Sequence, residues 1–196
     1  MLLLAPLAAA GCGKAEPNRI EPVYDENTGR LQLLRYDSDK DGRVDMTSEM
    51  DGSRIVRIAI DKDGDGRPER WEYYDKAQKV ERVGLSRQND GVEDAWSFPG
   101  PDGEVARIDI ATRRDGKVTR TEHYQNNVLV GADEDSDGDG RRDKWERYAD
   151  GRLLSVAFDT THRGTADRRL SYDVDGGAVL ELDPDGDGQF VAAASK

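Results

Sequence analysis

Short runs of apolar and aromatic residues recur along the chain, and each run is broken after about six or seven positions by Gly, Asp or Asn. Clear examples are residues 55–60, 105–110 and 153–158, in which apolar and polar side chains roughly alternate. Runs of β-branched and aromatic residues with a period of two, bounded by turn residues, are typical of strands and hairpins. No stretch keeps a helical period for long. The pattern therefore predicts an all-β chain of short antiparallel strands.

A short acidic sequence motif separates these runs at a nearly fixed interval. It has oxygen-bearing side chains at positions one, three and five and a glycine at position six. Four copies are complete, and they start at Asp37, Asp61, Asp135 and Asp183. Three eroded copies keep the glycine but few of the acids, and they start at Ser86, Ala111 and Asp159. Successive copies start 24 or 25 residues apart, and self-similarity at such a period is typical of repeat architectures.

The remainder of each unit also recurs, with an acid at position nine in most copies, then a Trp or Tyr, then a second turn such as Asp150-Gly151. Two strands joined by these two turns predict an antiparallel β-meander of ~24-residue hairpin repeats. All acidic loops would then lie along one rim of the sheet, with neighbouring loops roughly 10 Å apart because adjacent strands are about 4.8 Å apart. The pattern leaves open whether the sheet stays open, coils or closes.

The chemistry of the acidic motif indicates Ca²⁺ as a cofactor. Oxygen ligands at positions one, three and five followed by glycine are the front half of an EF-hand-type calcium loop. A hard cation takes six to eight oxygens, and three carboxylates in one tight turn repel one another without it. The alternative is a solvated acidic loop that binds no metal, and the eroded copies are best interpreted as plain turns.

The expected ligands form four groups. They are Asp37, Asp39, Asp41 and Asp45 with the backbone carbonyl of Arg43; Asp61, Asp63, Asp65, Glu69 and Glu72; Asp135, Asp137, Asp139, Asp143 and Glu146; and Asp183, Asp185 and Asp187. The last group is expected to be the weakest, because no acid follows it. Whether the acid at position nine or the glutamate at position twelve completes each ligand shell stays open.

Composition and charge narrow the choice of function. With 36% charged and 35% hydrophobic residues among 196, the chain is polar for one large core but suits a thin sheet. A net charge of −12 argues against nucleic acid as a partner. Four calcium ions would add +8 and bring the net charge to about −4, an ordinary value for a soluble surface.

No feature of the sequence indicates an enzyme. The two histidines, His123 and His162, lie in different units, and no nucleophile elbow or phosphate loop is present. We therefore expect a non-enzymatic protein. Trp71, Trp96 and Trp145 could stack on sugars, although their fixed place in the unit favours packing, and the number of carboxylates leaves a carbohydrate-active protein as an alternative.

The amino end is apolar and uncharged up to Cys12, the only cysteine, and reads Leu-Ala-Ala-Ala-Gly-Cys before and at that residue. This segment resembles a bacterial lipoprotein signal. The resemblance implies a signal peptide over residues 1–11, a lipidated Cys12 with a polar tether over 12–22, and a calcium-binding β-repeat domain over 23–196. Gly13 after the cysteine implies the outer membrane, on its periplasmic or its surface face. The alternative is an ordinary amino terminus with a buried free cysteine.

The repeats themselves carry two further resemblances. The loops are similar to the Asp-x-Asp-x-Asp-Gly-x-x-Asp calcium repeats of thrombospondin type 3 and dockerin modules, and the text from Tyr148 to Leu153 resembles the YD/RHS-type hairpins of bacterial surface proteins. Over about residues 23–190 the chain resembles bacterial lipoproteins in which such loops alternate with Trp/Tyr hairpins. These resemblances imply a lipid-anchored, extracytoplasmic scaffold or binding module with a protein or polysaccharide partner. The alternatives are a polysaccharide-binding or carbohydrate-active surface protein and a calcium-responsive component of an envelope complex.

Overall fold

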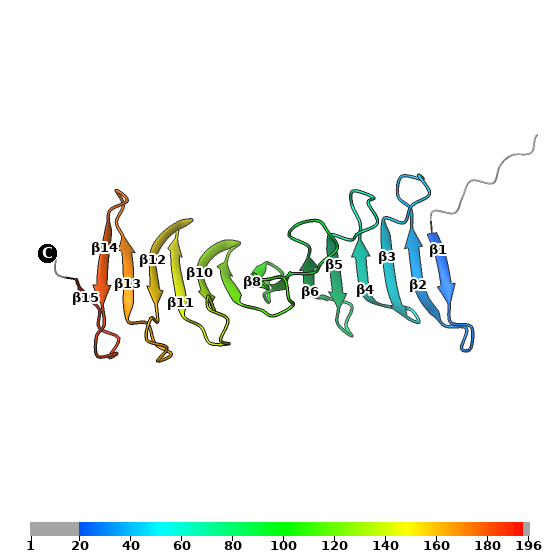
Figure 1. Cartoon of the computed structure of the whole chain (residues 1–196). Coiled ribbons are helices and arrows are strands. Elements are labelled where there is room, and N and C mark those ends of the chain that lie inside the picture. Colours follow the sequence, from blue (N-terminus) through cyan, green and yellow to red (C-terminus); the bar gives the residue numbers. More distant parts are fainter. Residues whose placement is uncertain (1–19, 194–196) are drawn as a thin grey trace, which may run out of the picture.

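The structure, a computed structural model, describes residues 20–193, which form a single antiparallel sheet of fifteen strands (Figure 1). Every strand pairs with its neighbours in chain order, so the expected all-β meander is confirmed. The strands are β1 (Ile20–Tyr24), β2 (Leu31–Tyr36), β3 (Met46–Asp51), β4 (Arg54–Ile60), β5 (Arg70–Tyr74), β6 (Val80–Leu85), β7 (Ala95–Pro99), β8 (Val105–Ile110), β9 (Arg120–Gln125), β10 (Val128–Glu134), β11 (Lys144–Ala149), β12 (Arg152–Phe158), β13 (Arg168–Tyr172), β14 (Ala178–Leu182) and β15 (Val191–Ala192). Within residues 20–193 no helix is long and apolar enough to cross a membrane.

The sheet is open, because β1 pairs only with β2 and β15 only with β14. It twists along its whole length, and the rim that carries the acidic loops lies at the top of Figure 1 between β2 and β3 but at the bottom between β14 and β15. The right-handed twist of each strand accumulates over many strands unless a closed barrel or a second sheet limits it. The acidic loops therefore follow a helical path around a long, narrow molecule.

The amino-terminal boundary of the sheet differs from the expected one. Strand β1 begins at Ile20, so residues 20–22 belong to the sheet instead of to the polar tether. Pro22 lies within this strand, and proline is tolerated on an edge strand because its missing N–H would face no partner. Cys12 and the expected signal peptide lie outside the described residues.

The two rims differ in how the chain turns. The seven acidic loops follow the even-numbered strands, whereas short turns join the odd-numbered strands to the next even ones. Asn126 and Asn127 between β9 and β10 have φ of 50° and 60°, and Asp150 and Gly151 between β11 and β12 have φ of 49° and 72°. Two successive left-handed residues make the tight turn whose twist matches that of the strands.

A bulge lies beside most of the short turns, for example between Arg147 and Tyr148 and between Tyr73 and Tyr74. A bulge adds a residue to one strand only and increases the local twist. The strands pair regularly beside the acidic loops, so the extra twist arises mainly beside the short turns.

The two faces of the sheet carry different side chains. Trp71, Trp96 and Trp145 lie in one register row on one face, which we call the tryptophan face. On the other face, the tyrosine face, the hydroxyls of Tyr74, Tyr124 and Tyr148 each donate to the glutamate two residues earlier in the chain. The tryptophans are two or more strands apart, so they do not pair directly. The residues opposite them in the register row are smaller, such as Gly84 and Asp109.

Candidate metal centres

All seven loops share one backbone conformation. The glycine at position six has φ between 79° and 92° in every copy. Position four is also left-handed in every copy, with φ of 67° at Lys40, 72° at Gly64, 52° at Asn89, 58° at Arg114, 84° at Gly138, 57° at His162 and 78° at Gly186. A left-handed residue is strained unless it is glycine, and Asn tolerates it better than most. The eroded copies therefore keep the turn after losing most of its acids.

Hydrogen bonds within the loop hold its carboxylates in place. In the second loop, Asp61 accepts the N–H of Gly64 at 2.9 Å and of Gly66 at 2.7 Å. Glu69 at position nine accepts the N–H of Lys62 at 2.8 Å. The complete loop that starts at Asp135 repeats this arrangement, with Asp135 accepting from Gly138 and Gly140. The backbone thus points the acidic side chains into the turn, where they lie close together.

Four loops bring three acidic side chains close enough to share one cation, with the candidate ligand atoms of each group within 4.8 Å of one another. The groups are Asp37, Asp39 and Asp41; Asp61, Asp63 and Glu69; Asp135, Asp137 and Asp143; and Asp183, Asp185 and Asp187. Each group comes from one of the four complete copies. These clusters could hold a metal ion, and their oxygen donors suit a hard cation.

Electrostatics in the second loop favours a bound cation. The N–H of Asp65 lowers the pKa of Asp63, but burial and the negative charges of Asp65, Glu69 and Asp61 outweigh it and raise the pKa above its ordinary value. Burial raises the pKa of Glu69, but hydrogen bonds from the backbone of the loop outweigh burial and leave the pKa below its ordinary value. The loop therefore combines one carboxylate fixed as an anion with another that is crowded by like charges. A cation would relieve this crowding.

Some expected ligands are not among the clustered acids of their own loop, and they take part in other hydrogen bonds. Asp45 accepts hydrogen bonds from the backbone N–H and the hydroxyl of Ser38, and it is not in the cluster of its own loop. Asp65 likewise accepts the N–H of Arg67 at 2.8 Å. Arg43 donates its own N–H to Asp41 at 2.8 Å, and its guanidinium to the carbonyl of Gly64 at 2.7 Å.

The two glutamates at position twelve are engaged on the tyrosine face. Glu72 accepts from Arg70 at 3.0 Å and from Tyr74 at 2.7 Å. Glu146 accepts from Arg120 at 2.7 Å and Tyr148 at 2.9 Å, and pairs with Lys144 at 2.8 Å. Burial raises the pKa of Glu146, but the bonds from Arg120 and Lys144 outweigh it and bring the pKa to about 2. Position nine therefore reaches two of the clusters, whereas position twelve stabilises the sheet.

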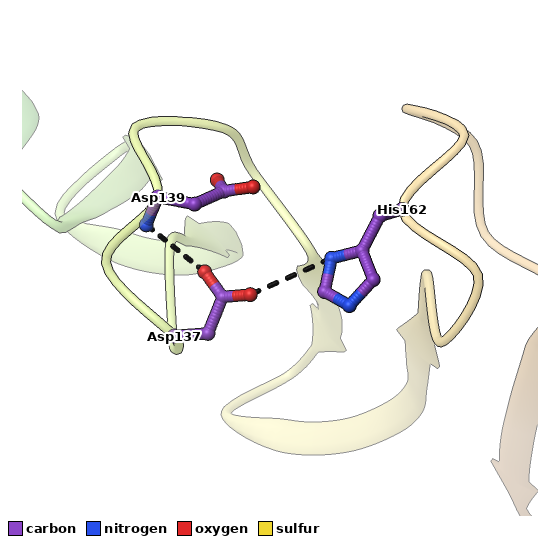
Figure 2. Close-up of side chains that lie close together, drawn as sticks. All are labelled: Asp137, Asp139 and His162. Atoms are coloured by element: carbon purple, nitrogen blue, oxygen red, sulfur yellow. Dashed lines mark hydrogen bonds and ion pairs between the residues drawn. The ribbon is translucent and has the colours of Figure 1, made fainter.

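A fifth group joins two loops (Figure 2). His162 at position four of an eroded loop faces the preceding complete loop, with its Nδ1 3.5 Å from an Asp137 carboxylate oxygen. The N–H of Asp139 donates to the other oxygen of Asp137 at 3.0 Å. The sequence placed His162 in a turn, and nothing in its local pattern indicated that it lies beside the acids of another unit.

Arginines connect neighbouring loops along the rim. Besides Arg43, Arg87 donates to the carbonyl of Ala111 at 3.4 Å, and Arg113 to that of Ser136 at 3.3 Å. Between the first two loops there is a cavity of about 260 Å³, lined by acids that include Asp39, Asp41, Asp61 and Asp63. The rim is therefore a row of linked loops.

No family model matches this sequence, and a search of curated proteins finds no match either.

Proposed function

We propose that the chain is a calcium-binding repeat protein that serves as a non-enzymatic scaffold or binding module. The observation that carries the proposal is the recurrence of one cluster of three acidic side chains, in the same turn, in four separate loops. A single acidic cluster on a surface is common without an ion, but four in register along one rim share a cause. Oxygen-only donors at the spacing of an EF-hand loop favour Ca²⁺ over softer metals.

In this proposal the ions stabilise a sheet that has little other support. Only six hydrophobic residues are buried within residues 20–193: Trp71, Ala95, Ile110, Ala111, Ala132 and Val156. An ion bound only by the folded loop stabilises the fold by mass action, even at the weak affinity common in extracytoplasmic modules. Calcium would thus replace part of a missing core and would offset the repulsion along an acidic rim.

Metal counting and calorimetry on the purified chain test the proposal directly. We expect about four calcium ions per chain, weaker binding of magnesium, and the loss of about one ion in Asp137→Ala. The matched control is Asp115→Ala, because Asp115 holds position five of an eroded loop outside every cluster. A chain that binds no calcium, or an Asp137→Ala variant with an unchanged count, contradicts the proposal.

The lipid anchor is a further part of the proposal and is supported only by the resemblance around Cys12. A chain expressed with its own amino end in a Gram-negative host would carry acyl groups on Cys12 and fractionate with the outer membrane. The Cys12→Ser variant would lose both properties. An unmodified Cys12 in the wild-type chain would reject the anchor without bearing on calcium.

A second candidate function, binding of an envelope polysaccharide, is favoured by a groove on the tryptophan face. The groove has a volume of about 1080 Å³ and is lined by Trp145, Arg147 and Phe190, with small residues such as Gly131 and Ala157 between them. An aromatic ring beside a polar side chain in an open groove suits a sugar ring and its hydroxyls.

Within this groove the guanidinium of Arg169 lies 4.4 Å from the ring centre of Phe190, and arginines also lie over aromatic rings in the other half of the tryptophan face. There the guanidinium of Arg82 lies 4.1 Å from the ring centre of Tyr73, and that of Arg107 lies 4.1 Å from the ring centre of Phe98. Trp71 is only 7% exposed.

We expect envelope glycans to change the fluorescence of the wild-type chain and of Trp71→Phe, but not of Trp145→Phe. Indifference of the wild-type chain to a broad glycan panel would remove this candidate.

A further inference from the structure

We propose that the eroded loop over residues 86–94 carries its own cation, the guanidinium of Arg114, in the place that a metal ion would take in a complete loop. The loop would then be a metal-free copy of its neighbours. The spacing of acids in this loop had indicated a plain turn.

The geometry points to this role. Arg114 stands at position four of the next loop along the rim and reaches back to the loop before it. Its Nε donates to Asp94 at 2.9 Å, while its two terminal nitrogens donate to Gln88 and Asp90. These partners hold positions three, five and nine. In the complete loops, positions one, three, five and nine supply the clustered carboxylates. The guanidinium contacts three of these four positions, and the fourth, position one, is Ser86, which hydrogen-bonds Asp90.

The burial of Asp94 explains why this loop needs a positive charge. Its side chain is 0% exposed, and its second cationic neighbour, Arg87, lies at 3.4 Å. A buried carboxylate is costly unless a charge and hydrogen bonds compensate it. The hydrogen bond from Arg114 also lowers the pKa of Asp90 to about 2. One guanidinium therefore pairs with both Asp90 and Asp94.

The backbone at Arg114 supports the same interpretation. The residue has φ of 58°, in the left-handed region that favours glycine. Three complete loops have glycine at this position: Gly64, Gly138 and Gly186. A glycine would remove the strain but supply no charge. Glycine would suit the turn of Arg114 itself better. The arginine is therefore explained by the neighbouring loop, which needs a positive charge.

The consequence is a division of the sheet by metal dependence. The loop over 86–94 would stay closed without calcium, whereas the complete loops on either side of it would open. This consequence rests on the proposed calcium binding, but the role of Arg114 does not. Calcium would then order two flanking segments around a centre that is already folded.

The first experiment compares Arg114→Ala with Arg113→Ala, both full-length and in chelator. Arg113 is the adjacent exposed arginine, and it bonds only a carbonyl of the following loop. We expect the melting temperature to fall by about 5 °C in Arg114→Ala and much less in Arg113→Ala. Adding Asp94→Asn to Arg114→Ala should recover part of the loss, because the uncompensated charge is removed. Equal melting temperatures for the two arginine variants, or no recovery in the double variant, would overturn the proposal.

The second experiment is hydrogen exchange on the wild-type chain with and without calcium. Residues 86–94 should keep the same protection in both conditions and lose it in Arg114→Ala. Strong protection that appears there only with calcium would refute an internal cation. If calcium protects no loop at all, the proposed function fails, while the comparison of the arginine variants in chelator still decides the role of Arg114.

Discussion

The loop over 61–69 and the loop over 86–94 are consecutive on one rim and share one backbone, yet they neutralise their acids in different ways. The first crowds Asp61, Asp63 and Glu69 together, and the arginine that reaches it, Arg43, bonds the carbonyl of Gly64. The second places Arg114 among Gln88, Asp90 and Asp94. The comparison teaches that the turn itself does not require metal. Backbone hydrogen bonds set its shape, and the charge balance decides what must fill it.

The largest expected effect is that of calcium removal, which separates the two kinds of loop. For calcium ten- to a hundredfold above the dissociation constant, each site contributes about 1.4–2.7 kcal/mol. Four sites should therefore raise the melting temperature by more than about 10 °C. Circular dichroism melts in calcium, magnesium and chelator measure this, and a melting temperature that ignores calcium would contradict the metal-dependent half of the comparison.

The next effect concerns Glu146, which decides whether position twelve belongs to the loop or to the sheet. Glu146→Gln should leave the calcium count unchanged but destabilise the chain by about 1–3 kcal/mol, because Arg120 and Lys144 lose a largely buried partner. Glu81→Gln, on an exposed part of β6, is the control and should be nearly neutral. A count lower by one would place Glu146 in the ligand shell after all.

A smaller effect is that Asp→Asn substitutions in the two loops should shift the melting temperature in opposite directions. In chelator, Asp63→Asn should raise the melting temperature by about a degree or two, since it removes a carboxylate crowded by like charges. Asp90→Asn should lower it, since Asp90 pairs with Arg114. In calcium, Asp63→Asn should become destabilising while Asp90→Asn keeps its sign. Thermal melts of both variants in both buffers test this. If both variants shift the melting temperature in the same direction in each buffer, the two loops share one mechanism and the comparison fails.

The smallest expected effect is in the acid range. The pKa of Asp90 falls from its ordinary 3.8 to about 2 in the folded chain, so its contribution is complete above about pH 4–5 and is lost as the pH falls through 2. The melting-temperature difference between the wild type and Asp90→Asn in chelator should be constant from neutral pH to about 5 and then shrink to zero. A difference at pH 2 that is as large as the difference at pH 5 would mean that Asp90 acts through something other than its charge.

The sequence by itself determined the repeat, the strands and the rim. Alternating apolar runs, Gly and Asp turns and a 24- to 25-residue interval are local signals, and a meander needs only local pairing to form. In each complete loop, three of the acids at positions one, three, five and nine lie close together, because a short loop fixes its own geometry. The calcium ion, the lipid on Cys12 and the envelope partner stay predictions.

Only the tertiary structure decided which side chains from different units meet. Arg114 and His162 turn back to the preceding loop, and Glu146 binds Arg120, which lies 26 residues earlier. These contacts depend on register and twist, which place units side by side at distances that the spacing of residues within one unit does not encode. The open edges and the groove beside Trp145 have the same origin, because they depend on how fifteen strands twist together.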